Sequence, residues 1–163
     1  MLVEIEKGAV QVGHSATRDQ VMALQNMMLQ LPQAPGMDTE HFFAGGMYCR
    51  KIAIPRGTII VSKVHKTEHF FIGCVGELQV AGQGETYTVR PGDIVPSPVG
   101  TKRVVFALTD VIVLCVHKTD HTTADDGLEE ELMEIDPLSQ YDVNNKPKPG
   151  VLVGTPGVEQ LEN

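Results

Sequence analysis

The sequence has no Cys-x-x-Cys pair and no even set of cysteines from which a disulfide framework could form. Its three cysteines, Cys49, Cys74 and Cys115, are far apart, and each lies in an apolar stretch. Isolated cysteines in an odd number are typical of a reducing compartment, where they pack as small hydrophobic side chains. We therefore expect free thiols and a cytoplasmic protein.

Long apolar runs and basic stripes are also missing. No segment approaches the roughly 20 apolar residues of a membrane-spanning helix, so we expect no membrane partner. The net charge of −8 is carried entirely by residues 121–163, which have 10 acidic and two basic residues; residues 1–120 have 11 of each. A chain without a basic stripe is poorly suited to contact along a nucleic-acid backbone, so we expect no long nucleic-acid partner.

Several catalytic signatures are absent from the sequence as well. It contains no nucleophile elbow, phosphate-binding glycine loop or zinc-finger pair, and its carboxylates show no spacing that suggests an acid–base pair. What the chain does have is enough apolar material for one core, because 42% of its 163 residues are hydrophobic.

Short β-branched runs alternate with glycine and proline turns from Met47 onward. We predict strands at 47–54, 58–65, 69–75, 77–81, 86–90, 93–96, 102–108 and 111–117. About eight short strands in this rhythm are typical of a jelly roll. The sequence thus divides into an N-terminal helical segment (1–46), a β-barrel (47–120) and an acidic C-terminal extension (121–163).

Two helices flank the predicted strands. Ser15 or Thr17 is a suitable N-cap for a helix that ends before Pro32. A second, acidic helix is predicted over 127–135, with Leu128, Leu132 and Ile135 on its apolar side. Beyond it the chain reads as an extended tail that docks on the body or on a neighbouring subunit.

Residues 57–103 resemble both sequence motifs of the cupin family without a gap. The first motif is a glycine, a His-x-His pair, a glutamate and a second glycine, and its positions are occupied here by Gly57, Lys63, His65, His69 and Gly76. The second motif is a glycine, Pro-x-Gly and a histidine, and its positions are occupied by Gly92, Pro98, Gly100 and Arg103. The resemblance implies a mainly β protein built on a cupin-like jelly-roll barrel.

The same resemblance implies four metal ligands, but only His65 is retained as such, with His69 as a substitute able to bind metal. Lys63 and Arg103 occupy the other two positions, and their positive charges repel a divalent ion. We therefore expect no cofactor. A divalent metal remains possible on His65 and His69 if a third ligand comes from His41, His117 or Glu68. From the alternation of side chains along the last predicted strand, we expect the His117 side chain to point outward.

Strand alternation predicts a cluster of cationic and cation-capable side chains inside the barrel mouth, with Lys102 at its rim. The cluster consists of Lys63, His65, His69 and Arg103. Buried positive charge needs a counter-charge, and a guanidinium suits phosphate or carboxylate, so we predict a small anionic ligand. Phe71 would form a stacking wall of the ligand pocket with its ring. Arg50 would be a further hydrogen-bond donor to the anion if its face of the strand points inward. In the alternative, Lys63 or Arg103 pairs with Glu68, Glu77 or an acid of the tail and holds the mouth closed.

The N-terminal segment, the segment 65–69 and the segment 98–103 together also resemble a cupin-like group common among phage and prophage proteins, over roughly residues 20–120. That resemblance implies a binder without enzymatic activity, which would sequester a small anion such as a nucleotide signal of anti-phage defence in the host cytoplasm. The resemblance to cupins, which often pair through barrel strands, implies a homo-oligomer. Two alternatives remain open. One is a metal-dependent cupin enzyme, an isomerase, lyase or dioxygenase, that uses His65 and His69. The other is a structural or assembly protein.

Overall fold

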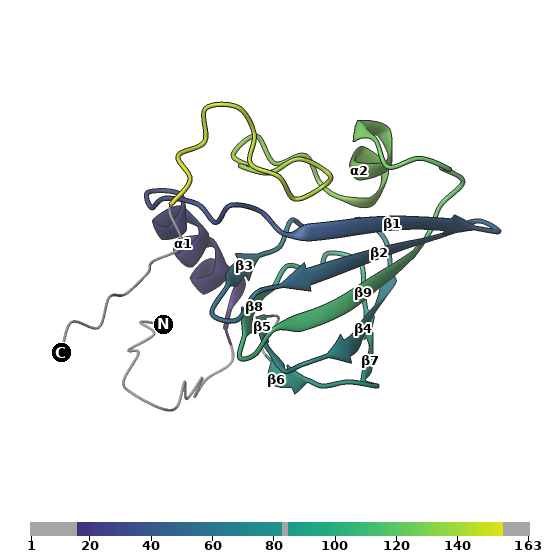
Figure 1. The fold of residues 1–163 in the computed structure, drawn as a ribbon, viewed down its shortest axis with the longest axis horizontal. Coiled ribbons are helices and arrows are strands. Elements are labelled where there is room, and N and C mark those ends of the chain that lie inside the picture. The colour runs from purple at the N-terminus through teal and green to yellow at the C-terminus, as the bar shows by residue number, and fades with distance from the viewer. Residues whose placement is uncertain (1–15, 83–84, 155–163) are drawn as a thin grey trace.

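A computed structural model describes residues 16–82 and 85–154 (Figure 1). The strands are β1 (Asp38–Ala44), β2 (Met47–Ile54), β3 (Ile59–Val61), β4 (His69–Val75), β5 (Leu78–Gly82), β6 (Glu85–Val89), β7 (Ile94–Ser97), β8 (Val104–Ala107) and β9 (Val111–Lys118). The helices are α1 (Arg18–Met28) and α2 (Asp126–Leu132). The chain is therefore mainly β, as predicted.

The strands form two antiparallel sheets that face each other as a jelly roll. One sheet has the order β1-β2-β9-β4-β7 and the other the order β3-β8-β5-β6. Side chains from both inner faces form the main core, in which Leu78, Val80 and Val113 are almost completely buried. Because successive side chains of a strand alternate between its faces, one face of each sheet is committed to this core.

Strand β1 was not predicted, because its residues were assigned to the N-terminal helical segment. It pairs along its full length with β2, which extends the larger sheet to five strands. The two strands are joined by Gly45 and Gly46, which have φ values of 55° and 79°. Two consecutive left-handed residues make the tight turn that suits a β-hairpin, and Gly-Gly is one of its sequence signals. That signal outweighs the scarcity of β-branched residues in β1, which has only Thr39.

Both helices begin close to where the sequence predicts. Thr17 is the N-cap of α1 and forms a capping box with Gln20. Helix α2 starts one residue early, on the N-cap Asp125, and ends at Leu132, so the prediction that Ile135 joins its apolar side is wrong: Ile135 is largely exposed. In the described part of the chain, neither helix combines the length and the apolar character needed to cross a membrane.

The acidic C-terminal extension docks on the body of the same chain. After α2 it runs back past β1 and β2 towards α1 (Figure 1). Arg50 holds it by donating to the Val143 carbonyl at 3.1 Å and to Asn145 Oδ1 at 2.7 Å. Further along, Gln33 N–H donates to the Leu152 carbonyl at 2.8 Å. Up to residue 154, the extension thus packs along the body of the chain.

Candidate metal centre

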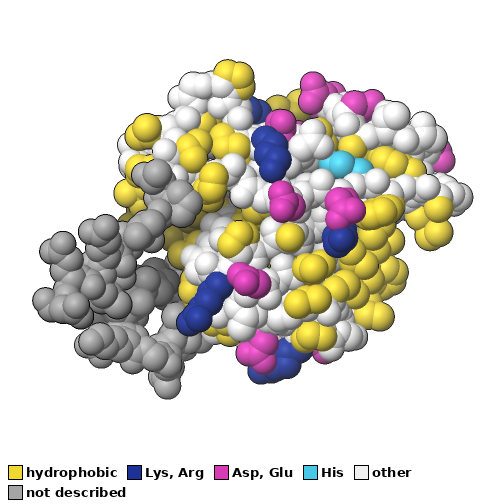
Figure 2. Space-filling view, viewed as in Figure 1, with side chains coloured by type: hydrophobic (Ala, Val, Ile, Leu, Met, Phe, Trp, Pro, Cys, Tyr) yellow, Lys and Arg dark blue, Asp and Glu magenta, His cyan; other side chains and the backbone are white. Residues whose placement is uncertain are grey.

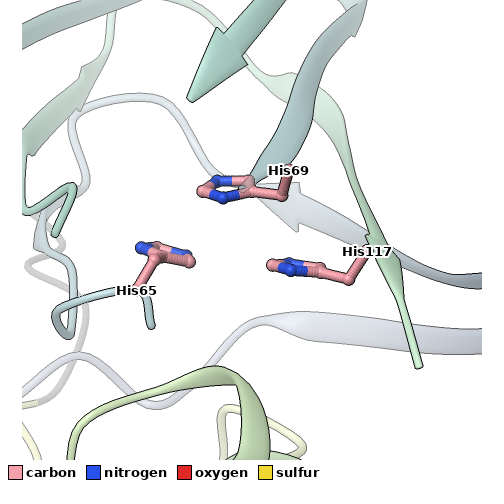
Figure 3. Close-up of side chains that lie close together, drawn as sticks. All are labelled: His65, His69 and His117. Atoms are coloured by element: carbon pink, nitrogen blue, oxygen red, sulfur yellow. The ribbon is translucent and has the colours of Figure 1, made fainter. Parts of the chain in front are cut away.

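Three histidine side chains lie together inside the barrel mouth. Each of His65, His69 and His117 offers one ring nitrogen, and these nitrogens lie within 4.8 Å of one another. Figure 3 shows His65 approaching from one side and His69 and His117 from the other. The three residues are only 8%, 6% and 2% exposed, respectively, so the rings are closed off from bulk water.

Two of these histidines are brought together by strand pairing. His69 begins β4 and is directly opposite His117 of β9, so both side chains leave the same face of the sheet as neighbours. Their ring centroids are 4.6 Å apart. The prediction that His117 points outward is therefore wrong.

His65 reaches the group from outside a regular strand, because β3 ends at Val61. Its backbone is fixed by two hydrogen bonds: His65 N–H donates to the Thr101 carbonyl at 3.0 Å, and Gly100 N–H donates to the His65 carbonyl at 2.8 Å. The 98–101 turn thereby holds the ring over His69, at a centroid distance of 4.1 Å.

Hydrogen bonds to carbonyls orient two of the three rings. His65 Nδ1 lies 3.2 Å from the Thr101 carbonyl, and His69 Nδ1 lies 3.4 Å from the Thr67 carbonyl. A carbonyl can only accept, so both Nδ1 atoms carry the proton and Nε2 keeps its lone pair. Backbone carbonyls orient metal-binding histidines in this way in many proteins. His117 Nδ1 is buried and has no hydrogen-bond partner among the described residues.

The electrostatics of the group keep all three rings neutral. Burial is the main cause, and it lowers the pKa of His65 to about 3, that of His69 to about 4 and that of His117 to about 3. The nearby Arg103 charge lowers the pKa of His65 and His69 further. Metal binding needs unprotonated imidazole, so the donor set fits a transition-metal ion at neutral pH.

Arg103 lies beside the histidines and is 6% exposed. Its guanidinium donates to Ser97 Oγ at 2.5 Å and to the Tyr87 hydroxyl at 3.4 Å, and it lies 5.2 Å from the centre of the Phe71 ring. Phe71, predicted as a stacking wall, thus supports the guanidinium. Among the side chains that the structure describes, no carboxylate lies within ion-pair distance of Arg103.

The other predicted anion donors are engaged elsewhere. Lys63 forms an ion pair of 2.7 Å with Glu129 of α2. This is the alternative in which Lys63 pairs with an acid of the C-terminal extension instead of a ligand. Lys102 is not at the rim but 4% exposed, and it donates to the Ser62 carbonyl at 2.7 Å. Arg50 does point inward, yet it binds the C-terminal extension.

Helix α2 covers the barrel mouth above the histidines. Leu128, Leu132 and Met133 pack against Tyr48 of β2, and the Tyr48 ring lies 6.0 Å from that of His117. The backbone closes the contact, because Lys66 N–H donates to the Leu132 carbonyl at 2.8 Å. His41, considered as a third ligand, instead shares a hydrogen bond of 2.8 Å with the Tyr48 hydroxyl.

His117 is one of the three third ligands considered from the sequence, but its inward orientation could not be inferred because β9 is apolar on both faces. Its first six residues, Val-Ile-Val-Leu-Cys-Val, carry no polar alternation from which an inner face could be read. Only the pairing with β4, whose inward residues include His69 and Phe71, shows that the His117 side chain is on the inner face of the sheet. Adding His117 replaces the pair that the sequence predicted with a set of three nitrogen donors.

No family model matches the chain, and no curated protein is similar to it. Among solved structures, a cupin superfamily protein from Desulfitobacterium hafniense is 9% identical, with a TM-score of 0.48 over 55% of this chain and 84% of its own. The cupin-2 domain of an XRE family transcriptional regulator from Enterobacter cloacae is 16% identical, with a TM-score of 0.46 over 53% and 99%. Salicylate 1,2-dioxygenase from Pseudoaminobacter salicylatoxidans is 17% identical, with a TM-score of 0.47 over 60% and 30%. Each likeness concerns the fold alone.

Proposed function

We propose that the protein holds one divalent transition-metal ion on His65, His69 and His117 and that a small anion binds between this ion and Arg103. The observation that carries the proposal is the convergence of three buried, neutral imidazoles within 4.8 Å. Two of them present Nε2, because their Nδ1 atoms face backbone carbonyls. Metal sites that act on a bound molecule typically have three protein ligands and leave further coordination positions open.

Arg103 supports an anion as the second component. Its guanidinium is buried, it is near enough to lower the pKa of two of the histidines, and its described partners are two neutral hydroxyls. A bound carboxylate or phosphate would neutralise the charges of Arg103 and the metal together. A metal in this position would act as a Lewis acid towards the bound oxygen.

The covered mouth favours a second candidate, in which the same site retains an anion without turning it over. Helix α2 would have to move for each molecule that enters or leaves, and the Lys63–Glu129 ion pair opposes that movement. Small carboxylates and phosphates, nucleotides included, belong to the ligand class in both cases. Release of an altered product under multiple-turnover conditions separates an enzyme from a sequestering protein.

The metal half of the proposal is tested by thermal unfolding. Chelator-treated wild type is melted with and without Zn²⁺, Mn²⁺ or Co²⁺, beside His117→Gln and a control outside the group of three histidines, His121→Gln. A ligand at about 100 times its dissociation constant stabilises the folded state by about 2.7 kcal/mol. We expect the wild type and His121→Gln to gain stability and His117→Gln to gain none. Equal gains in all three proteins would place the metal elsewhere.

The anion half is tested on the metal-loaded protein. A panel of small carboxylates and phosphates is titrated into the wild type and Arg103→Met, which keeps an unbranched apolar stem against Phe71. Loss of the guanidinium should weaken binding by about 2–5 kcal/mol, as for one member of a buried charge pair. Unchanged affinity in Arg103→Met would remove Arg103 from the site while leaving the metal claim intact.

A further inference from the structure

His117 differs from the other two histidines of the group in what orients its ring. The Nδ1 atoms of His65 and His69 face backbone carbonyls, whereas His117 Nδ1 is buried and has no hydrogen-bond partner among the described residues. The torsion between Cβ and an imidazole ring has a broad distribution, so burial by itself does not fix the plane of the ring. The orientation of His117 must therefore come from the groups that pack against its faces.

One row of side chains crosses the inner side of the five-stranded sheet at the level of the histidines. The strand register places its members directly opposite one another, in order from β1 to β7: Phe43, Tyr48, His117, His69 and Ser97. Directly opposite residues on neighbouring strands are the pairs whose side chains interact most closely. The His117 ring is therefore enclosed between its neighbours on β2 and β4.

The outer side of the same strands is apolar at this level. Each member of the inner row has an outward neighbour in the sequence, and these are Phe42, Cys49, Val116, Phe70 and Pro96. Figure 2 shows hydrophobic side chains gathered on the right of the molecule, over the part of the sheet where Figure 1 places β4, β7 and β9. The ring nitrogens and hydroxyls of the row are thus all on the side of the barrel mouth.

The ring of Tyr48 lies along one face of the His117 ring. Their centroids are 6.0 Å apart and their planes differ by 26°, while the His69 ring lies on the β4 side at 4.6 Å and 17°. Both distances are within the roughly 4.5–7 Å of interacting aromatic pairs. An imidazole between two nearly parallel rings loses both contacts when it turns about its Cβ–Cγ bond. Since His69 is itself a candidate ligand, Tyr48 is the neighbour that holds the ring from outside the group.

The packing around Tyr48 fixes its own ring. Tyr48 is 3% exposed, and its ring centroid lies 5.0 Å from that of Phe43. Leu128 and Leu132 of α2 pack against it as part of one buried cluster. A side chain enclosed on β1 and by α2 keeps a single orientation, so it is a firm surface for the His117 ring.

A hydrogen bond to His41 fixes the far end of Tyr48. The phenol oxygen lies 2.8 Å from His41 Nδ1, and His41 Nε2 lies 2.9 Å from Asn144 Oδ1 of the C-terminal extension. An amide oxygen can only accept, so Nε2 carries the proton of the neutral ring and Nδ1 accepts from the Tyr48 hydroxyl. Burial lowers the pKa of His41 and raises the pKa of Tyr48 to about 12, so both have the protonation states that this bond needs at neutral pH.

We propose that Tyr48 is the positioning residue of His117 in the metal centre. This inference rests on the proposed function, because it concerns how the third metal ligand is oriented. The hydrogen bond to His41 holds the phenol, and the phenol ring holds the imidazole plane. The imidazole then presents one nitrogen to the point where those of His65 and His69 converge (Figure 3). Tyr48 thus does for His117 what the backbone carbonyls do for the other two histidines.

Co²⁺ binding to chelator-stripped protein tests this role, measured as a dissociation constant and as the visible absorption of the bound ion. Loss of a group that orients a metal ligand typically weakens metal binding by about 10–100-fold. We expect Tyr48→Leu to weaken Co²⁺ binding by that factor and to change the absorption bands. Tyr48→Phe keeps the ring and should restore most of the affinity. The matched control is Phe70→Leu, which removes a ring beside His69 on the outer side and should bind Co²⁺ as the wild type does.

Circular dichroism and urea unfolding at pH 7.5 establish the folded fraction, so that each dissociation constant refers to folded protein. If Tyr48→Leu does not fold, Tyr48→Met takes its place, because the flexible methionine side chain fills the space without a ring. A variant that is merely less stable would keep the wild-type absorption bands once folded. The changed bands expected of Tyr48→Leu therefore separate positioning from packing.

The proposal and the metal site can fail separately. Wild-type Co²⁺ affinity and absorption in Tyr48→Leu, with binding lost in His117→Gln, would overturn the positioning role and leave the metal on the three histidines. A loss in Tyr48→Phe as large as that in Tyr48→Leu would also overturn it, because the hydroxyl and not the ring would then be responsible. Equal Co²⁺ binding by wild type and His117→Gln would overturn the proposed function, and the positioning role with it.

Discussion

Acid should destabilise the metal-free protein steeply, because three buried histidines must stay neutral for the chain to fold. The ordinary histidine pKa of 6.5 applies to the unfolded chain, whereas the folded pKa values are about 3, 4 and 3 for His65, His69 and His117. Between these values the unfolded chain binds protons that the folded chain does not. The resulting stability is complete above about pH 6.5 and is lost progressively as the pH falls towards 4 and 3.

The size of the effect follows from the same values. Lowering the pH from 7 to 5 should reduce the free energy of unfolding by about 2 kcal/mol for each histidine, or about 6 kcal/mol for the three. A typical domain has a total free energy of unfolding of about 5–15 kcal/mol. The midpoint of thermal unfolding should therefore fall by about 20 °C for a chain of this length.

Urea unfolding in a chelator, repeated at half-unit steps of pH, measures this dependence. His117→Gln is the internal control, because it removes one of the three groups and should lower the slope with pH by about one third while retaining the contribution of every surface carboxylate. A wild-type stability that changes by less than about 1 kcal/mol between pH 7 and 5 would refute the burial argument.

Two further predictions concern the ion pair between α2 and the barrel mouth and the turn between β4 and β5. Lys63→Met and Glu129→Gln, combined in a double-mutant cycle, should give a coupling energy of about 1–2 kcal/mol, because the paired side chains are only 21% and 22% exposed; a coupling of zero would mean that the pair does not hold α2 down. Gly76→Ala should cost more than about 3 kcal/mol, since its φ is 74° and a Cβ there would meet the Asp110 carbonyl. Gly92→Ala, with a φ of 93° and no atom within 4 Å of the added carbon, should cost about 1 kcal/mol, and equal losses would contradict the clash.

Much of the fold was predictable because its signals are local. Alternating β-branched runs and glycine turns located eight of the nine strands to within a few residues, and Thr17 and the acidic run after Asp125 located the helices. Strand β1 was not predicted, because its composition is ambiguous and only the Gly45–Gly46 turn reveals its pairing.

The candidate site was only partly predictable, since it depends on long-range pairing. His65 and His69 are close in sequence, and their shared position could be inferred from the chain alone. His117 joins them only through the register of β9 against β4, and both faces of β9 are apolar for different reasons. The inner face packs in the core, while the outer face carries Ile112, Leu114 and Val116. The pairing of Lys63 with Glu129 likewise depends on where α2 docks.

The most direct test of the metal centre is a Co²⁺ titration of chelator-stripped protein, followed by visible absorption and by metal analysis after gel filtration. We predict one bound ion per chain, with absorption bands of nitrogen coordination, in the wild type and in His121→Gln. We predict neither in His117→Gln, which should remain folded at pH 7.5. Absence of bound Co²⁺ in the wild type, or equal binding by His117→Gln, would contradict the assignment of the metal to the three histidines.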